Sequence, residues 1–511
     1  MQNIINLNSS IPEIFLSISI LGQLLFGAYL AYNKHYKYSA VLKEISVHTN
    51  ITVFFLVTIY LFEEASIQNS IGLYKDGVLF SKIATVIFGM YVLVFLSYAL
   101  KTQKIIHFEY YFFYLVALLS LLLMLNVNDL LMFYLTMEAQ TLCFYVLASA
   151  NRTSIFSVEA ALKYFIAGSF FSASFLAGTA LLYGCLGTIN LEEIYALLSF
   201  GLGNYSIQIE SLVFLAIVLI TSTLLFKIAS APFHFWMPDV YEGAPISSTM
   251  VFSILPKFPL IFFLIKWLNS LAELQYYIKD SLVFFGVIST LIGTLYALKQ
   301  LKVKRMVLYS SIAQVGFIVS AIGLETNESL SSVLFFTIIY IITSILVWGN
   351  IILINSSTTD VSLTDSSVVD SLYISNFSNA ISYNFFWKVI FSVIFFSIAG
   401  IPPFVGFTSK FLILKALVLD NYLISAVLLI VISSVSVFYY IRILKISFFE
   451  THYNQAIYDE SSDSVIKKGS DELFLPHFVI VLLTSFLILL FFYPNIVITF
   501  VNSIVLSSFL I

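Results

Sequence analysis

The sequence predicts an all-α polytopic membrane protein whose helices form two similar halves, each interrupted by a break. Of 511 residues, 60% are hydrophobic and only 10% are charged, whereas soluble proteins carry about 25% charged residues. Apolar runs long enough to cross a bilayer recur along the whole chain, and prolines cluster at two places within them. No soluble core could bury this much apolar surface, so most of it must face lipid or other membrane helices.

A helix that spans the bilayer needs about 20 mostly apolar residues, and about 14 runs meet or nearly meet this length. The second run is the shortest. The runs begin near residues 11, 46, 77, 109, 128, 156, 210, 246, 281, 305, 329, 383, 420 and 473. The two longest polar stretches, 355–379 and 450–472, are expected to be solvent-facing linkers rather than domains.

Charges between the runs predict an orientation. Loops after odd-numbered runs are mostly basic, and loops after even-numbered runs are neutral or acidic. The positive-inside rule therefore puts the odd loops on the cytoplasmic or matrix side and both chain ends outside. Two odd loops break this alternation. One carries Asp239 and Glu242, and the other carries Asp360, Asp365 and Asp370.

Prolines predict two broken helices. Five of the ten prolines fall between residues 232 and 259, and two more are Pro402 and Pro403. A proline inside a helix removes a backbone hydrogen bond and breaks or kinks the helix. The breaks are therefore expected in KIASAPFHFWMPDVYEGAP and SIAGIPPFVGFTSK. Paired interruptions mark inverted repeats in transporters, and a separation of roughly 170 residues fits two similar five-helix units.

Five ionisable residues lie inside otherwise apolar runs: Glu138, Lys163, Lys227, Lys257 and Lys410. An ionisable group at the bilayer centre costs roughly 3 kcal/mol, so such residues are functional by default. A buried lysine can release a proton near neutral pH, and a neighbouring carboxylate opposes that release. We therefore predict that Glu138 pairs with a lysine as a switch, and that water joins the lysines into a proton relay.

Other polar residues are ambiguous. His234 follows the first break proline closely, and it could relay protons or simply hydrogen-bond the broken backbone. Four residues of one run could line a wet path, although ordinary hydrogen bonds between helices are favoured; they are Tyr309, Ser310, Ser311 and Gln314. Asp239 and Glu242 are expected to organise a loop. Lysines near run ends can extend to the membrane interface, which is the expectation for Lys82, Lys266, Lys388 and Lys415.

No cofactor site is predicted for this chain. Two isolated cysteines, Cys143 and Cys185, cannot hold an iron–sulfur cluster, and no haem-attachment motif is present. No two of the six histidines share a helical face at close spacing. The net charge is -4, without a basic tract, so nucleic acid is not an expected partner.

Three motifs carry a family resemblance: SAPFHFWMPDVYEGAPISS, KRMVLYSSIAQVGF and AGIPPFVGFTSKF, in this order and spacing. Together they resemble the antiporter-like membrane subunits of respiratory complex I, over most of residues 109–450. The run MEAQTLCFYVLAS favours the subunit 2 branch. Lys410 also favours this branch, because subunit 4 relatives are expected to have glutamate there. The lack of the long lateral helix that subunit 5 carries favours it too.

The resemblance implies roles for the buried residues. Spans 4–8 and 9–13 would form the two inverted repeats. Glu138 and Lys227 would be the family's glutamate–lysine pair, Lys257 the central lysine, Lys410 the lysine of the second half-channel, and Lys163 a further lysine. Gln314 departs from relatives that have histidine, which argues against a proton path there. FMN, iron–sulfur clusters and ubiquinone would belong to partner subunits.

These arguments predict a proton-translocating membrane-arm subunit of NADH:ubiquinone reductase (complex I), driven by redox chemistry in other subunits. Its partners would be other membrane-arm subunits, including other antiporter-like chains, and lipids. Abundant Phe (51) and Tyr (31) are typical of an AT-rich organellar gene, so the mitochondrial inner membrane is expected, or the plasma membrane in a prokaryote.

Four units are expected along the chain: N-terminal helices (1–108), a first repeat (109–270), a second repeat (271–450), and a polar loop with a last span (451–511). Two other functions remain open. One is a subunit of a multi-subunit Na⁺/H⁺ antiporter, which shares the motifs. The other is a purely structural membrane subunit.

Overall fold

The computed structural model describes residues 11–32, 38–67, 76–105, 107–199, 207–271, 274–359, 374, 385–449 and 470–508. Within these ranges the chain is helical, and its β pairing is an isolated bridge between Asp129 and Asn190. Among the described residues, thirteen helical segments are long and apolar enough to cross a membrane, one of them, Ile246–Asn269, made of two helices. The predicted all-α membrane fold is therefore confirmed. Most of the polar stretches 355–379 and 450–472, with Asp360, Asp365 and Asp370, lies outside the described residues.

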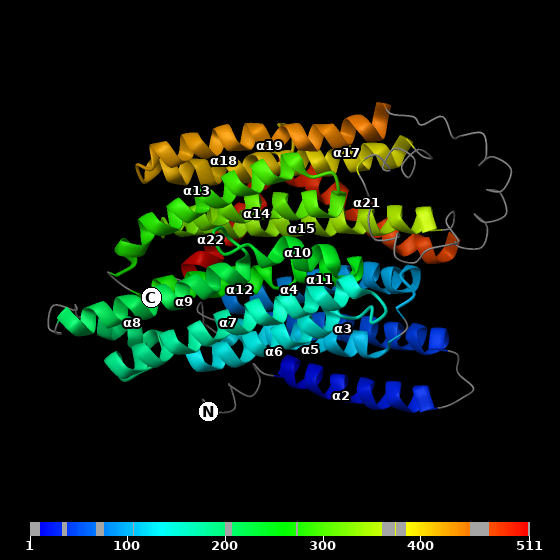
Figure 1. Cartoon of the computed structure of the whole chain (residues 1–511), viewed down its shortest axis with the longest axis horizontal. Coiled ribbons are helices and arrows are strands. Elements are labelled where there is room, and N and C mark those ends of the chain that lie inside the picture. Colours follow the sequence, from blue (N-terminus) through cyan, green and yellow to red (C-terminus); the bar gives the residue numbers. More distant parts are fainter. Residues whose placement is uncertain are drawn as a thin grey trace.

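Three helices precede the first repeat: α2 (Ile11–Tyr32), α3 (Tyr38–Ile67) and α4 (Asp76–Thr102). Although α3 was predicted to be the shortest span, it is 30 residues long. The reason is that its polar first turns are helical too, and a count of apolar residues does not include them. The described part of the N-terminal unit thus consists of three long helices packed beside one another (Figure 1).

The segment predicted as the first repeat contains α5 (Glu109–Asn126), α6 (Leu130–Ala148), α7 (Ile155–Leu186), α9 (Ile207–Ile228), α11 (Ile246–Ile254) and α12 (Lys257–Asn269). Two short helices, α8 (Leu191–Ser199) and α10 (Trp236–Gly243), lie in its connections. Local sequence sets the ends of α7. The Ser154 hydroxyl accepts a hydrogen bond from the Ser157 amide at its start, and Gly187 ends it with φ 78°, a left-handed conformation that glycine adopts without strain.

The segment predicted as the second repeat contains α13 (Gln275–Lys299), α14 (Val303–Ile322), α15 (Asn327–Thr359), α17 (Phe385–Ala399), α18 (Val405–Leu419) and α19 (Leu423–Phe449). It is followed by α21 (Ser470–Phe492) and α22 (Pro494–Ser508). The last predicted span is therefore interrupted at Tyr493. Proline lacks an amide hydrogen and is favoured as the first residue of a helix, so Pro494 begins a new one.

Both predicted breaks are present. The first separates α9 from α10, and the second separates α17 from α18. A further interruption at residues 255–256 divides α11 from α12, because Pro256 cannot continue the hydrogen-bond ladder of α11. It places Lys257 at the start of a helix rather than within one. The α17–α18 pair accounts for the predicted span near residue 383.

The helices run side by side along one direction (Figure 1). The N-terminal and first-repeat helices lie toward one long side of this view, and α17, α18 and α19 lie along the other. The helices α11, α12, α14 and α15 are almost wholly buried, so the residues they carry lie in the interior. α13 and α14 approach closely because of small residues: a Cβ at Gly293 would lie 2.6 Å from the Ala313 nitrogen.

Candidate functional site

Lys257 follows the interruption between α11 and α12, and its side chain reaches the first break. It is buried at the start of α12, directly after Pro256. Its Nζ donates a hydrogen bond to the carbonyl of Ile228, the last residue of α9, at 3.2 Å. The last carbonyls of a helix lack intrahelical donors and carry the negative end of the helix dipole. The break therefore supplies a partner that favours a cation in an apolar interior.

Lys410 repeats this arrangement at the second break. It is buried on α18, and its Nζ donates to the carbonyls of Ile398 (3.0 Å) and Ala399 (2.9 Å) at the end of α17. Gly400 makes the approach possible. Its φ is +80°, and a Cβ there would lie 2.9 Å from Lys410 Cδ. In both halves, a buried lysine of the following segment thus binds the free carbonyls of a broken helix.

Glu138 and Lys227 form no closed ion pair in this structure. Lys227 is buried on α9, where Glu138 acts on it electrostatically. Its Nζ has no hydrogen-bond partner, and Glu138 Oε1 is also buried without one. The Thr141 hydroxyl donates to Glu138 Oε2 at 3.4 Å. Buried polar atoms without partners are costly, so both groups remain available to water or to each other.

Three small cavities lie beside these lysines. One of ≈ 10 Å³ is lined by Lys227 and Lys257, among others. A second of ≈ 30 Å³ is lined by Ser310, Ser311, Gln314, Tyr340 and Thr343. A third of ≈ 20 Å³ is lined by Gln314, Tyr340, Thr343 and Lys410. A water molecule needs roughly 10–15 Å³ and a few polar partners, so each cavity can hold about one or two waters.

Tyr340 and Gln314 connect the two lysines of the breaks. The centroid of the Tyr340 ring lies 5.7 Å from Lys257 Nζ. The same tyrosine lines the two larger cavities, and its Oη is buried without a hydrogen-bond partner. Gln314 Nε2 donates to the Ile398 carbonyl at 3.3 Å, the carbonyl that Lys410 also binds. Gln314 therefore lines the space between the lysines. The absence of a histidine at this position had argued against a proton path there.

The polar residues of α14 do not all line a cavity, and they do not all form contacts between helices. The hydroxyls of Ser310 and Ser311 donate to the Val307 and Leu308 carbonyls of their own helix, and both serines line the larger cavity. Tyr309 instead stacks on Tyr296, with ring centroids 5.4 Å apart. Both serines thus offer polar surface to the cavity. The Ser311 hydroxyl also donates to Met237 Sδ of α10 at 3.9 Å, in agreement with the favoured prediction of hydrogen bonds between helices.

Lys163 and His234 do not join the buried lysines through any contact among the described residues. The Lys163 side chain is 50% exposed on α7, although the sequence placed it inside an apolar span. It pairs with Glu159 at 2.8 Å, one helical turn away, and with Asp239 at 3.8 Å. His234 is buried in the first break, and its Nδ1 has no hydrogen-bond partner. A relay role for either residue stays a prediction.

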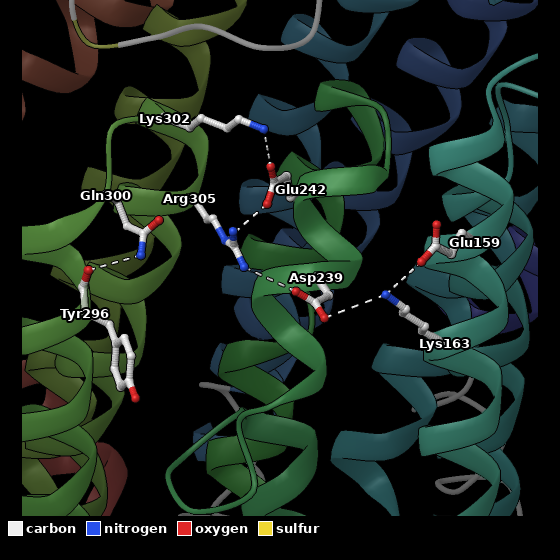
Figure 2. Close-up of polar contacts among 8 residues, drawn as sticks. All are labelled: Glu159, Lys163, Asp239, Glu242, Tyr296, Gln300, Lys302 and Arg305. Carbon is white, nitrogen blue, oxygen red and sulfur yellow. Dashed lines mark hydrogen bonds and ion pairs between the residues drawn. The ribbon is translucent and has the colours of Figure 1, made fainter.

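A chain of alternating charges links α7, α10 and α14, as Figure 2 shows. Arg305 of α14 binds Asp239 of α10 through Nη2 at 3.4 Å and Glu242 through Nε at 3.1 Å. Lys302 binds Glu242 at 2.7 Å. The two acidic residues that broke the predicted charge alternation are thus neutralised by the basic loop after span 9. They organise α10, as expected, but through partners in the other repeat.

Lys304 fixes the end of the same short helix. It is buried, and its Nζ donates to the backbone carbonyls of Glu242, at 3.2 Å, and Ala244. These carbonyls lie at the end of α10, where a cation satisfies free acceptors and complements the dipole. Three basic residues at the start of α14 thus hold the segment that leads from the first break toward Lys257.

Two lysines expected to extend to the interface do not do so. Lys82 is buried and in contact with Glu13. Lys266 donates to the Leu125 carbonyl at 2.9 Å and lies over the Phe262 ring. The expectation was wrong for both, because each finds a polar partner inside the protein. Lys415 is half-exposed and pairs with Glu328 at 3.1 Å, in agreement with a position at the protein surface.

Residues 127–438 match the family model described as "NADH:quinone oxidoreductase/Mrp antiporter, TM". Among curated proteins, the chain is 31% identical over 458 residues to NADH-quinone oxidoreductase subunit N of Pelagibacter ubique, covering 87% of this chain and 90% of that protein. It is 33% identical over 463 residues to NADH-ubiquinone oxidoreductase chain 2 of Marchantia polymorpha, covering 88% and 90%.

Solved structures share the fold. A chain of respiratory complex I from Thermus thermophilus gives a TM-score of 0.71 at 23% identity, over 96% of this chain and 100% of that chain. A chain of the Mrp complex from Dietzia sp. DQ12-45-1b gives 0.79 at 16% identity, over 98% of each. The helix arrangement in Figure 1 is therefore that of a known membrane fold.

Proposed function

Since the chain belongs to the NADH:quinone oxidoreductase/Mrp antiporter family of membrane subunits, we propose that it is a proton-translocating subunit of the complex I membrane arm. The relatives named subunit N and chain 2 support this choice within the family. Redox chemistry would take place in partner subunits that hold FMN, iron–sulfur clusters and ubiquinone. Among the described residues no group of His, Cys, Asp and Glu could hold a metal.

The proton path runs from Glu138 and Lys227 through Lys257 to Lys410. When Glu138 approaches Lys227, its negative charge holds the lysine proton. When it withdraws, the buried ammonium is destabilised and its proton moves to Lys257 through the cavity between them. Protons then cross the cavities beside Tyr340 and Gln314 to Lys410, which releases them. Each step is a transfer between nitrogen and water, and no electron moves.

One observation carries this proposal: in each half, a buried lysine binds carbonyls at the end of a broken helix. Carbonyl partners hold an ammonium without a fixed counter-charge, so the loss of its proton leaves no carboxylate unpaired. A structural ion pair would need such a carboxylate. Unwound helix ends of this kind coordinate transported cations in other membrane transporters.

The experiment replaces Lys257 by alanine in the assembled complex. The proton-to-electron ratio of NADH oxidation should fall, because protons can no longer cross from the first half to the second. Lys415→Ala is the matched control, since Lys415 is half-exposed and pairs only at the surface. An unchanged ratio in Lys257→Ala, with normal assembly, would count heavily against the relay.

A second candidate is a subunit of a multi-subunit Na⁺/H⁺ antiporter, supported by the fold likeness to the Mrp complex chain. It predicts sodium-dependent proton movement without NADH oxidation. Purification decides between the two, because a complex I subunit should come with flavin and iron–sulfur clusters. Other membrane-arm subunits and lipids are the proposed partners, and the mitochondrial inner membrane is the proposed location.

A further inference from the structure

A second buried ion pair lies outside the proposed relay. Lys82 of α4 contacts Glu13 Oε1 of α2, and the two side chains are only 5% and 6% exposed. Both residues precede the segment 127–438 that the family model matches. Moving a carboxylate and an ammonium out of water is unfavourable, and their attraction compensates only in part. The N-terminal unit therefore carries a costly charged site of its own.

Polar groups crowd one oxygen of Glu13 and leave the other without a donor. Besides Lys82, the Tyr60 hydroxyl donates to Glu13 Oε1 at 3.2 Å, and Asn126 Nδ2 donates at 3.5 Å. Glu13 Oε2 is buried and accepts no hydrogen bond. A buried acceptor without a donor is destabilising, so this oxygen is the one that can bind a proton without the loss of an existing hydrogen bond.

Further charges surround the pair. Glu63 of α3 interacts electrostatically with both Glu13 and Lys82. Lys266 of α12 interacts electrostatically with Lys82 and with Glu192. Two carboxyl groups and two ammonium groups thus share one interior region, at the ends of helices from the N-terminal unit and the first repeat. A proton gained or lost by one of them changes the field at the others.

This region is continuous with the protein surface. Lys266 donates to the Leu125 carbonyl at the end of α5. The next residue, Asn126, donates to Glu13. Beyond it, Asn128 donates to the exposed carboxylate of Glu192 at 3.3 Å. A line of polar groups therefore leads from an exposed glutamate on α8 to the buried Glu13.

We propose that Glu13 and Lys82 form a second proton-exchange site, distinct from the Glu138–Lys410 relay and open to the aqueous face beside α8. On uptake, a proton from water bonds to Glu13 Oε2 and converts the carboxylate to a carboxylic acid. Lys82 remains an ammonium. On release the O–H bond breaks, the electron pair stays on oxygen, and the proton returns to water by way of the polar end of α5.

Infrared spectroscopy of the assembled complex at a series of pH values tests this site. The wild type should show a protonated-carboxyl band that grows as pH falls and is lost in Glu13→Gln. The amide of that variant still accepts from Tyr60 and Asn126. Glu328→Gln is the matched control, since it removes an exposed paired glutamate and should keep the band. Identical wild-type and Glu13→Gln spectra at every pH would overturn the proposal.

A second variant keeps the proposal testable if Glu13→Gln does not assemble. Lys82→Arg retains a cation beside Glu13 but spreads its charge over a guanidinium. The pH at which the carboxyl band is half-developed should shift in Lys82→Arg and stay unchanged in Lys415→Arg. The absence of a shift would mean that the pair only holds α2 against α4. Because these residues lie outside the relay, this outcome leaves the Lys257 experiment unaffected.

Discussion

The ammonium groups of Lys257 and Lys410 bind backbone carbonyls at the end of a broken helix, and these carbonyls take the place of water. The break leaves those carbonyls without donors from their own helix, and a glycine or proline causes the break. At the residue scale, the site therefore depends on backbone conformation as much as on the lysines. Substitution of the residues that allow the break should therefore impair the protein as much as substitution of the residues that carry protons.

Gly400→Ala tests this dependence. The φ of +80° and the Lys410 side chain 2.9 Å from a new Cβ both oppose a larger residue. We expect a loss of about 1–2 kcal/mol in unfolding free energy from the backbone alone, with reduced proton translocation. Gly184→Ala is the control, because a Cβ there meets nothing within 4 Å. Thermal unfolding of both variants measures the difference, and equal stability would contradict the account.

Glu325 predicts a pH dependence of stability. It lies between the spans Val303–Ile322 and Asn327–Asn355. Burial raises the pKa of its carboxyl from 4.5 to about 8, and Lys279 opposes the rise. The folded chain thus binds this proton more tightly than the unfolded chain. The resulting stability is fully present below pH 4.5 and is lost as pH rises through about 8.

Glu325→Gln should remove this part of the pH dependence, since an amide does not titrate. Melting temperatures measured from about pH 5 to about pH 9 should fall with rising pH in the wild type and fall less in the variant. Glu328→Gln serves as the exposed control. Parallel curves for wild type and Glu325→Gln would show that this carboxyl does not titrate as described.

At the element scale, the short helix α10 joins the two repeats. Arg305 and Lys302 hold its acidic side chains, and Lys304 holds the carbonyls at its end (Figure 2 for the first two). The ion pairs are partly exposed, and exposed pairs contribute about 0–1 kcal/mol each. Lys304 is buried, so its removal would leave buried carbonyls without donors.

Lys304→Met should therefore destabilise the protein more than Arg305→Met. We expect about 1–3 kcal/mol for the first and less than about 1 kcal/mol for the second. Denaturant unfolding of the two variants in one detergent measures the ratio. High salt should lower the stability of wild type and Lys304→Met, and affect Arg305→Met less. A larger loss in Arg305→Met would reverse the assignment of which contact holds α10.

The sequence predicted long elements well and short ones poorly. Apolar runs and prolines are local signals, and they predicted the spans and both breaks. The helices α8 and α10 carry polar residues over only a turn or two, so no such signal marks them. The partners of Lys82 and Asp239 were also out of reach. Glu13 is 69 residues from Lys82, and Arg305 is 66 residues from Asp239, and only the fold brings them together.

At the scale of the whole molecule, each half has a broken helix, and the two halves meet at buried α14 and α15. The apolar context in the sequence correctly predicted that Lys227, Lys257 and Lys410 are buried. Lys163 was not, because charged neighbours on α7 and α10 draw it to the surface. Helix spacing alone could not indicate that Tyr340 and Gln314 lie between the two break lysines.

The central claim is that water links Lys257 to Lys410 through the interior. A density map of the assembled complex, at a resolution that resolves ordered water, tests it most directly. The account predicts water in the cavities lined by Gln314, Tyr340 and Thr343, hydrogen-bonded to Tyr340 Oη and near Lys410 Nζ. Dry cavities, with apolar side chains closing the space between the two lysines in every state observed, would contradict it.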